Sequence, residues 1–198
     1  MSEFSDLLRH HLGGCLEITA EQSAALERHY ELLVRWNRVL NLTAIRNMEE
    51  AVVRHYCECL FFASLLPKSA RILDFGSGAG FPGIPIAVLR PECHVTLVES
   101  HQRKAVFLKE ATRGMAKIDV LAQRVEDLTG SWDVVVSRAV DPVEVLKQIP
   151  RLAPHSGLLV SGAGSQPAAA SQAALCERVK LPWGDDRWAM FHVKPQAE

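Results

Sequence analysis

From Arg71 to about residue 160, short apolar runs alternate with segments of helical pattern, and this alternation constrains the fold more than any other feature. Strands are predicted over residues 71–75, 94–98, 119–122, 132–136 and 157–160, and helices over residues 83–89, 101–115 and 142–149. Strands that alternate with helices are typical of right-handed βαβ units on a parallel sheet. Continuous apolar runs such as Val134 to Val136 indicate that both faces of the sheet are covered. The sequence therefore predicts an α/β fold.

The segment before the first predicted strand has two helical patterns. Apolar residues at a spacing of mostly three to four run from residue 21 to 40, and Thr19 with Gln22 has the pattern of a capping box. A second helix is expected from residue 48 to about 66, with Asn47 as its N-cap and Pro67 as its stop. We therefore expect an N-terminal helical cap, residues 1–66, in front of a core at residues 67–198, with both parts in one compact domain.

The C-terminal segment is predicted to add a helix over residues 168–174 and two strands over residues 178–181 and 188–193. The connection between these two strands is short, which is typical of an antiparallel pair. The sheet is therefore expected to have seven strands and to be mostly parallel, with one antiparallel strand near the end.

Composition and charge exclude several classes of protein. The chain has 198 residues, 48% of them hydrophobic, so it can form a full core without disulfides or structural metals. A net charge of -1 is not that of a polycation, so any RNA contact must use a local basic patch. Five cysteines without C-x-x-C spacing argue against a disulfide framework and a zinc site, and no metal is expected. Because signal-peptide and membrane-span patterns are lacking, a soluble cytoplasmic protein is expected.

The sharpest local signal is the segment 72–83, ILDFGSGAGFPG, in which a predicted strand runs into glycines and then into a helix. Gly78, Gly80 and Gly83 satisfy the pattern G-x-G-x-x-G, a weak indication of NAD or FAD when taken alone. Asp74 is expected to repel a pyrophosphate and to favour a cationic ligand such as S-adenosylmethionine. Glu99 ends the next strand, about 20 residues past the loop, the distance expected for an acid that binds ribose. Together these residues favour a methyltransferase, and a nucleotide oxidoreductase stays open as an alternative.

Two further segments follow later strands. Val125 and Glu126, after the third strand, are placed where backbone amides and a carboxylate can bind an adenine edge, and a solvated charge cluster is the alternative. Arg138 directly follows the apolar run of the fourth strand, and open α/β sheets bind their ligands at that edge. This position favours a functional cation over a surface ion-pair partner.

With these residues the sequence resembles the ribosomal RNA small subunit methyltransferase G family over residues 30 to about 194. The most telling pieces are Trp36-Asn37, Asn41-Leu42-Thr43, Arg54-His55, the loop 74–85, the segment 103–108, Arg124-Val125-Glu126 and Ser137-Arg138-Ala139. The resemblance implies a class I S-adenosylmethionine-dependent methyltransferase with a Rossmann-like fold. Its expected activity is methylation of N7 of one guanine in 16S rRNA, close to the decoding region, by a monomer that acts on the small ribosomal subunit. It also implies that the cofactor site is lined by Gly76, Gly78, Phe81, Glu99, Val125, Glu126 and Arg138, of which Arg138 is also expected to be catalytic.

The chemistry of that reaction agrees with the residues after the fourth strand. Guanine N7 already has a lone pair, so its attack on a sulfonium methyl needs positioning and a suitable field rather than a base. Enzymes that methylate exocyclic amines resemble one another in an Asn/Asp-Pro-Pro-aromatic run, and this chain has Ser137-Arg138-Ala139-Val140 there. Ser161 stands where the family usually has a lysine, so a binder of ribosome-assembly intermediates without catalytic activity is a second alternative.

Overall fold

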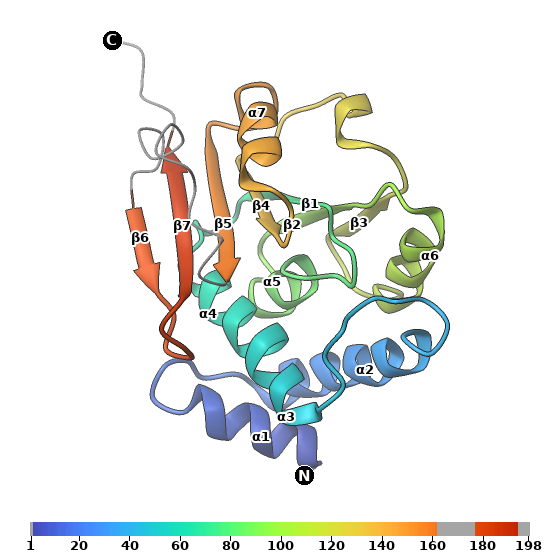
Figure 1. Cartoon of the computed structure of the whole chain (residues 1–198), viewed down its shortest axis with the longest axis vertical. Coiled ribbons are helices and arrows are strands. Elements are labelled where there is room, and N and C mark those ends of the chain that lie inside the picture. The colour runs from blue at the N-terminus through green and yellow to red at the C-terminus, as the bar shows by residue number, and fades with distance from the viewer. Residues whose placement is uncertain (1, 162–176, 194–198) are drawn as a thin grey trace.

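A seven-stranded sheet forms the centre of the computed structural model, which describes residues 2–161 and 177–193 (Figure 1). The strands are β1 (Arg71–Phe75), β2 (His94–Val98), β3 (Ile118–Leu121), β4 (Val134–Arg138), β5 (His155–Ser161), β6 (Glu177–Lys180) and β7 (Arg187–Val193). Their order is β3-β2-β1-β4-β5-β7-β6. The first five strands in that order pair in parallel, and β7 is antiparallel to both β5 and β6. The predicted architecture, including its single antiparallel strand, is confirmed.

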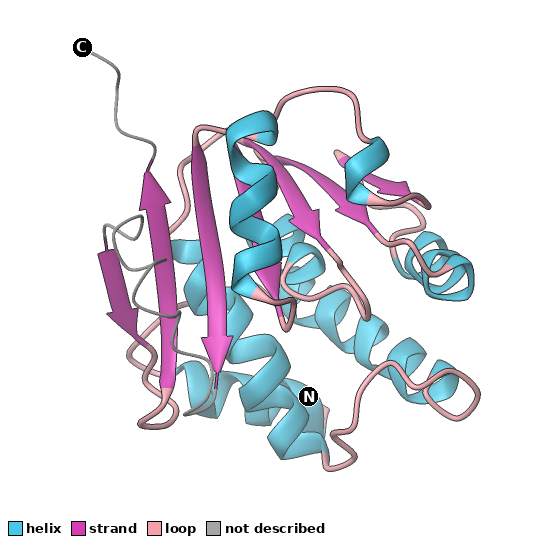
Figure 2. Cartoon of the chain, turned by 45° about the horizontal axis from the view of Figure 1, so that its top comes forward, coloured by secondary structure: helices cyan, strands magenta, loops and turns pink. Residues whose placement is uncertain are grey.

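The two faces of the sheet have separate hydrophobic clusters. On β1, Ile72 packs in a cluster with residues of the N-terminal helices and of the helices that follow β1 and β2, whereas its neighbour Leu73 packs on the opposite face. That second cluster includes Val145 and Ile149 of α7 (Pro142–Leu152), the helix that lies over the near side of the sheet in Figure 2. Successive side chains of a strand point to opposite faces of the sheet. A strand whose sheet is covered by helices on both faces therefore needs a continuous apolar run, as the sequence contains.

Helix α1 (Glu3–Leu12) was not predicted, so the expectation of two helices before the first strand is wrong. Ser2 caps this helix, since its hydroxyl accepts a hydrogen bond from the backbone N–H of Ser5. Phe4, Leu8 and Leu12 are buried, and their spacing of four puts them on one face. Because its other face is polar, the helix is strongly amphipathic, so the pattern was present in the sequence and was missed.

Helix α2 (Ala20–Trp36) has the predicted capping box of Thr19 and Gln22, but it ends four residues before the predicted end. Asn37 causes this ending, because its side-chain oxygen accepts hydrogen bonds from the backbone N–H groups of Leu42 and Thr43 at 2.8 and 3.1 Å. Its amide nitrogen also donates to the Thr43 carbonyl at 2.9 Å. One side chain thus folds the segment 37–43 into a compact elbow, where local hydrogen bonds of this kind replace helical ones.

The predicted second helix has three parts: α3 (Met48–Ala51), a π-helical segment (Val52–Cys57) and α4 (Glu58–Ser64). Asn47 is the N-cap, as predicted, and its side chain accepts from the backbone N–H of Glu50. A π-helix inserts an extra residue per turn and is often found at functional sites. Here it contains His55, so the change of helix type lies at a residue of the site described below.

The remaining elements differ from the prediction only at their ends. Strands β1 and β2 and helix α5 (Gly83–Leu89) have the predicted bounds, whereas α6 (Gln102–Ala111) ends earlier and α7 ends later. Strand β4 begins and ends two residues later than predicted, because its ladder with β5 continues to Arg138. The helix predicted over residues 168–174 lies outside the described residues. Across the described part of the chain, no helix combines the length and apolar character needed to cross a membrane.

Candidate active site

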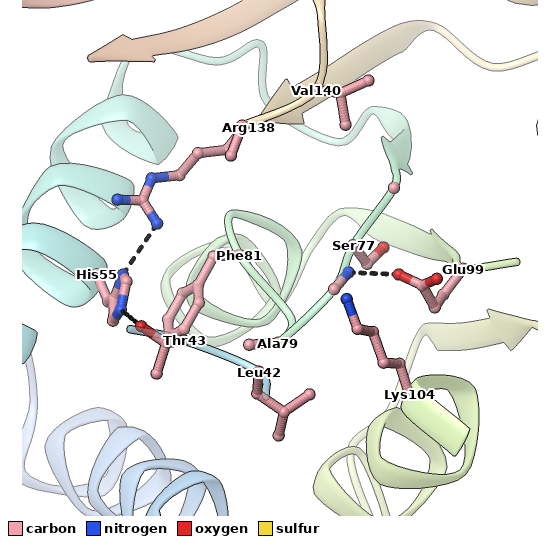
Figure 3. A pocket seen from close by; sticks show the side chains of 13 residues that line it. Leu42, Thr43, His55, Ser77, Ala79, Phe81, Glu99, Lys104, Arg138 and Val140 are labelled. Atoms are coloured by element: carbon pink, nitrogen blue, oxygen red, sulfur yellow. Dashed lines mark hydrogen bonds between the residues drawn. The ribbon is translucent and has the colours of Figure 1, made fainter. Parts of the chain in front are cut away.

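A cavity of about 500 Å³ lies at the carboxyl ends of β1, β2 and β4 (Figure 3). The strand order reverses between β1 and β4, because β2 and β3 follow β1 toward one edge of the sheet whereas β4 and β5 extend toward the other edge. Open α/β sheets bind ligands at such a switch point. The cavity therefore occupies the expected place for an active site. Its lining residues are Leu42, Thr43, His55, Gly76, Ser77, Gly78, Ala79, Phe81, Glu99, Lys104, Arg138, Ala139 and Val140.

The glycine loop after β1 forms the floor of this cavity. Gly76 has a φ of 71°, and a Cβ atom there would approach Cγ2 of Val140 to 2.8 Å. The position thus needs glycine both for its left-handed backbone and for the close approach of the segment after β4. Gly78, also predicted, lines the cavity two residues later.

Asp74 lies beneath the loop and does not line the cavity. The side chain is fully buried, and its Oδ2 accepts a hydrogen bond from the backbone N–H of Gly83 at 3.0 Å. Its Oδ1 has no hydrogen-bond partner among the described residues. Burial raises the pKa of Asp74 to about 7, against the opposing effect of the Gly83 hydrogen bond. Asp74 therefore shapes the loop from below.

Glu99 holds the same loop from the side. One carboxylate oxygen accepts from the backbone N–H of Gly78 at 2.9 Å, and the other accepts from the backbone N–H of His101 at 2.8 Å. Each carboxylate oxygen has two lone pairs, so both can accept a further hydrogen bond from a ligand. Glu99 lines the cavity, as expected for an acid that binds a ribose diol.

A second cavity, of about 140 Å³, brings in the remaining predicted residues. It is lined by Phe75, Gly76, Val98, Ser100, Gln123, Arg124, Val125 and Glu126. Val125 begins a short 3-10 helix, and with Val98 it gives this cavity an apolar wall. Gly76 lines both cavities, so an elongated ligand can extend from one into the other across the glycine loop.

Arg138 contributes a guanidinium group to the opposite wall of the main cavity (Figure 3). Its Nη1 lies 2.9 Å from Nδ1 of His55, and its Nη2 donates to the carbonyl of Arg54 at 3.0 Å. The carboxylate of Glu58 lies 3.7 Å away. His55 in turn contacts the Thr43 hydroxyl at 2.8 Å through its Nε2. The side chain of Arg138 is thus fixed at several atoms before any ligand binds.

Glu58 concentrates three guanidinium groups behind that wall. Its side chain is buried, and Arg54, Arg187 and Arg138 lie 3.4, 3.1 and 3.7 Å from its carboxylate. Burial raises the pKa of Glu58, and the three arginines oppose this effect. One carboxylate at the start of α4 thus organises arginines from the π-helical segment and from two strands, β4 and β7.

His29 of α2 ties the helical cap to the glycine loop. Its Nε2 lies 3.0 Å from the carbonyl of Ala79, which only accepts, so Nε2 carries the proton. Its Nδ1 therefore accepts from the Tyr56 hydroxyl at 3.0 Å. Burial lowers the pKa of His29 to about 4. Phe81 packs edge-on against His29 and stacks on the ring of His55 at a centroid distance of 4.7 Å, so the aromatic rings form a continuous wall.

The structure brings together all seven predicted site residues, in two adjoining cavities. It also adds residues that the sequence did not single out for this site, above all Thr43, His55 and Lys104. Arg54-His55 and Asn41-Leu42-Thr43 were noticed as motifs, but nothing local shows that both segments fold over the sheet edge.

Comparison with solved structures defines the class of protein. The fibrillarin of Aeropyrum pernix, solved with natively bound S-adenosyl-L-methionine, aligns with a TM-score of 0.55 at 14% identity, over 71% of this chain and 75% of that one. The N-methyltransferase NodS of Bradyrhizobium japonicum WM9 aligns with a TM-score of 0.52 at 17% identity, over 69% and 93% of the two chains. The fold is that of the class I S-adenosylmethionine-dependent methyltransferases.

The chain belongs to the rRNA small subunit methyltransferase G family, whose model matches residues 22–174. The protein named Ribosomal RNA small subunit methyltransferase G in Desulforamulus reducens is 38% identical over 142 residues, which cover 67% of this chain and 59% of that protein. Its namesake in Nitrosomonas europaea is 46% identical over 132 residues, which cover 64% and 60%. The alignments thus span about three fifths of the length of these two relatives. The family resemblance is confirmed.

Proposed function

We propose that this protein transfers the methyl group of S-adenosylmethionine to N7 of one guanine in 16S rRNA, near the decoding region. The family supports the class of reaction, and relatives in it carry the name of an rRNA small subunit methyltransferase. The observation that carries the proposal furthest is the cavity at the switch point, where Arg138 faces the glycine loop and Glu99. We further propose that the protein acts in the cytoplasm as a monomer, on rRNA within the small subunit.

The two adjoining cavities fit an elongated, partly charged cofactor. In this proposal Gly76, Gly78 and Phe81 bind the methionine end, Glu99 binds the ribose hydroxyls, and Val125 with Glu126 binds the adenine. The donor and acceptor chemistry agrees, since the free lone pairs of Glu99 suit a diol and the apolar wall at Val125 suits a base. The ionised fraction of Asp74, whose Oδ1 is unpartnered and whose pKa is raised to about 7, adds negative character below a ligand that carries positive charge.

The site is suited to a nucleophile that needs no deprotonation. When bound, S-adenosylmethionine supplies an electrophilic methyl group on a sulfonium. His55, the imidazole of the cavity wall, already accepts a hydrogen bond from Arg138 at Nδ1, and its pKa is lowered to about 3 by burial and by that arginine. It is therefore a poor general base, which disfavours exocyclic amines and favours a ring nitrogen such as N7. Arg138, held by His55 and by the Arg54 carbonyl, is the residue we propose to orient the cofactor or the incoming guanine.

The test is methyl transfer from labelled S-adenosylmethionine to intact small subunits and to naked 16S rRNA that lack the modification, followed by nucleoside mass spectrometry. We expect label in 7-methylguanosine at one site, and R138A should reduce the rate strongly while R138K restores only part of it. Label in another nucleoside would contradict the assignment of N7. Cofactor binding without transfer would support the non-catalytic binder, and tighter binding of NADH than of S-adenosylmethionine would support the oxidoreductase.

A further inference from the structure

A chain of three side chains runs along one wall of the main cavity, from Arg138 through His55 to Thr43 (Figure 3). The three residues come from the end of β4, from the π-helical segment and from the elbow after α2. Thr43, at the end of this chain, lines the cavity. The hydrogen bonds along these side chains have a fixed direction, and that direction determines whether Thr43 donates a hydrogen bond to a ligand or accepts one from it.

The direction is set by Arg138, because a guanidinium group only donates hydrogen bonds. Nη1 of Arg138 lies 2.9 Å from Nδ1 of His55, so Nδ1 must be the acceptor and carries no proton. In a neutral imidazole the other nitrogen then carries the proton. His55 therefore donates from Nε2 to the Thr43 hydroxyl oxygen, 2.8 Å away.

The Thr43 hydroxyl oxygen accepts a second hydrogen bond from its own elbow. The backbone N–H of Ile45 donates to the same oxygen at 3.1 Å. A hydroxyl has two acceptor lone pairs and one hydrogen, so both lone pairs of Thr43 are used and only its hydrogen remains. Thr43 can therefore meet a ligand in the cavity as a donor and not as an acceptor.

The surroundings of His55 hold this arrangement in place. The imidazole is buried, and its ring stacks on Phe81 with the two planes 18° apart. Burial and the positive charge of Arg138 lower the pKa of His55, so the neutral ring persists throughout the physiological range. The ring is thus held in both its orientation and its protonation state.

We propose that Thr43 is a positioned hydrogen-bond donor for an acceptor oxygen of the bound ligand, with His55 as the positioning residue that sets its direction. This inference rests on the proposed function, which supplies two such oxygens. One is the carboxylate of the methionine end of the cofactor. The other is O6 of the target guanine, which shares a base edge with N7. Adenine has an amino donor in that position, so a fixed donor at Thr43 also selects against adenine.

The test compares T43V, which removes the hydroxyl at nearly constant shape, with T43S, which keeps it. T112V is a matched control, because the Thr112 hydroxyl donates to the Leu108 carbonyl within α6. For each variant we would measure the dissociation constant of S-adenosylmethionine by calorimetry, and kcat and KM for methyl transfer to unmodified small subunits. Thermal unfolding would identify any variant that does not fold.

A loss of cofactor affinity by roughly tenfold in T43V, with recovery in T43S, would assign the oxygen to the cofactor carboxylate. Unchanged cofactor affinity with a roughly three- to tenfold fall in kcat/KM for the RNA substrate would assign it to guanine O6. If T43V matches T112V and the wild type in both measurements, the proposal is wrong. In that case the wild type would still methylate guanine, so the proposed function would stand although the proposed role of Thr43 had failed.

A second measurement tests the direction of the chain without reference to activity. Nitrogen NMR of the labelled protein distinguishes the two neutral tautomers of a histidine, and the signal of His55 is assigned by its loss in H55Q. We expect His55 to be protonated at Nε2 and not at Nδ1 at neutral pH. A proton on Nδ1 would overturn the proposal, because Thr43 would then no longer be restricted to donating.

Discussion

The carboxylate of Glu99 accepts a hydrogen bond from the backbone N–H of Gly78 at 2.9 Å, so the acid at the end of β2 holds the glycine loop that follows β1. The two residues lie 21 positions apart, in the segments that directly follow the neighbouring parallel strands β1 and β2. A side chain proposed to bind the cofactor thus also shapes the loop that binds the same molecule.

This double role predicts the effect of E99A. Removing the carboxylate takes away an acceptor for ribose and leaves the N–H groups of Gly78 and His101 without their partner. We expect S-adenosylmethionine binding to weaken by about 1–3 kcal/mol, measured by calorimetry. E92A, at an exposed residue, is the control and should bind normally. Unchanged affinity in E99A would remove Glu99 from the cofactor site.

Glu58 is expected to dominate the stability of the wall behind Arg138. In E58A the guanidinium groups of Arg54, Arg138 and Arg187 lose the buried carboxylate that they share. Breaking a buried ion pair from one side leaves uncompensated charge, so we expect a loss of about 3–5 kcal/mol in the free energy of unfolding. Urea unfolding followed by circular dichroism measures this loss.

E144A is the matched control for that experiment. Glu144 pairs with Lys147 on the exposed side of α7, with more than half of its side chain exposed. Exposed pairs of this kind contribute little, so E144A should change the stability by less than about 1 kcal/mol. Equal effects of the two variants would contradict the assigned role of Glu58.

Gly83 is predicted to be intolerant of any side chain. A Cβ atom there would collide with Leu97 and would approach Oδ2 of Asp74 to 2.6 Å. G83A should therefore lower the free energy of unfolding by about 1–3 kcal/mol. G114A is the control, because its Cβ would meet nothing within 4 Å and only the left-handed backbone opposes it. If both variants lose the same stability, crowding at Gly83 is not the cause.

The buried neutral His29 predicts a loss of stability in acid. Its pKa is lowered to about 4 in the folded protein, against an ordinary value of 6.5, so between these values the unfolded state binds more protons. The stabilisation is full above pH 6.5 and is lost as the pH falls toward 4. Relative to H29Q, the wild type should lose roughly 2–4 kcal/mol across this window, measured by chemical unfolding at a series of pH values. A constant difference between the two proteins would argue against a buried neutral His29.

Asp74 predicts the opposite trend in nearly the same window. Burial raises its pKa to about 7 in the folded protein, against an ordinary value of 3.8, so the folded state keeps a proton that the unfolded state loses. Its contribution is full below pH 3.8 and is lost as the pH rises toward 7. The wild type should therefore lose a few kcal/mol relative to D74N between pH 4 and 7.

Asp74 and His29 change the free energy of unfolding in opposite directions as the pH rises. The stability of the wild type alone should therefore vary less with pH than either contribution would by itself. The comparison with D74N isolates the carboxylate, and D127N, at an exposed residue, should follow the wild type. If the wild type and D74N keep a constant difference, the carboxylate of Asp74 is ionised throughout.

Local patterns in the sequence were enough to predict the elements of the core and to identify the glycine loop. Strands β1 and β2 and helix α5 have the predicted bounds, because apolar runs, glycines and caps act on the backbone within a few residues. Glu99 and Arg138 could be predicted as site residues because strand ends in a parallel sheet meet at one edge, and the family resemblance added Gly76 and Gly78.

Which distant side chains meet at that edge depends on the packing of the helices against the sheet. Arg138 and His55 are 83 residues apart, and their contact depends on how the helical cap packs over the sheet. The contact of Thr43 with His55 likewise depends on packing between distant elements. The direction of the Asp74 side chain, toward the backbone of Gly83, also could not be read from its position on the strand. Local sequence patterns predict helices, strands and turns. The direction of the hydrogen bonds from Arg138 through His55 to Thr43 instead arises from packing between elements that lie far apart in the sequence.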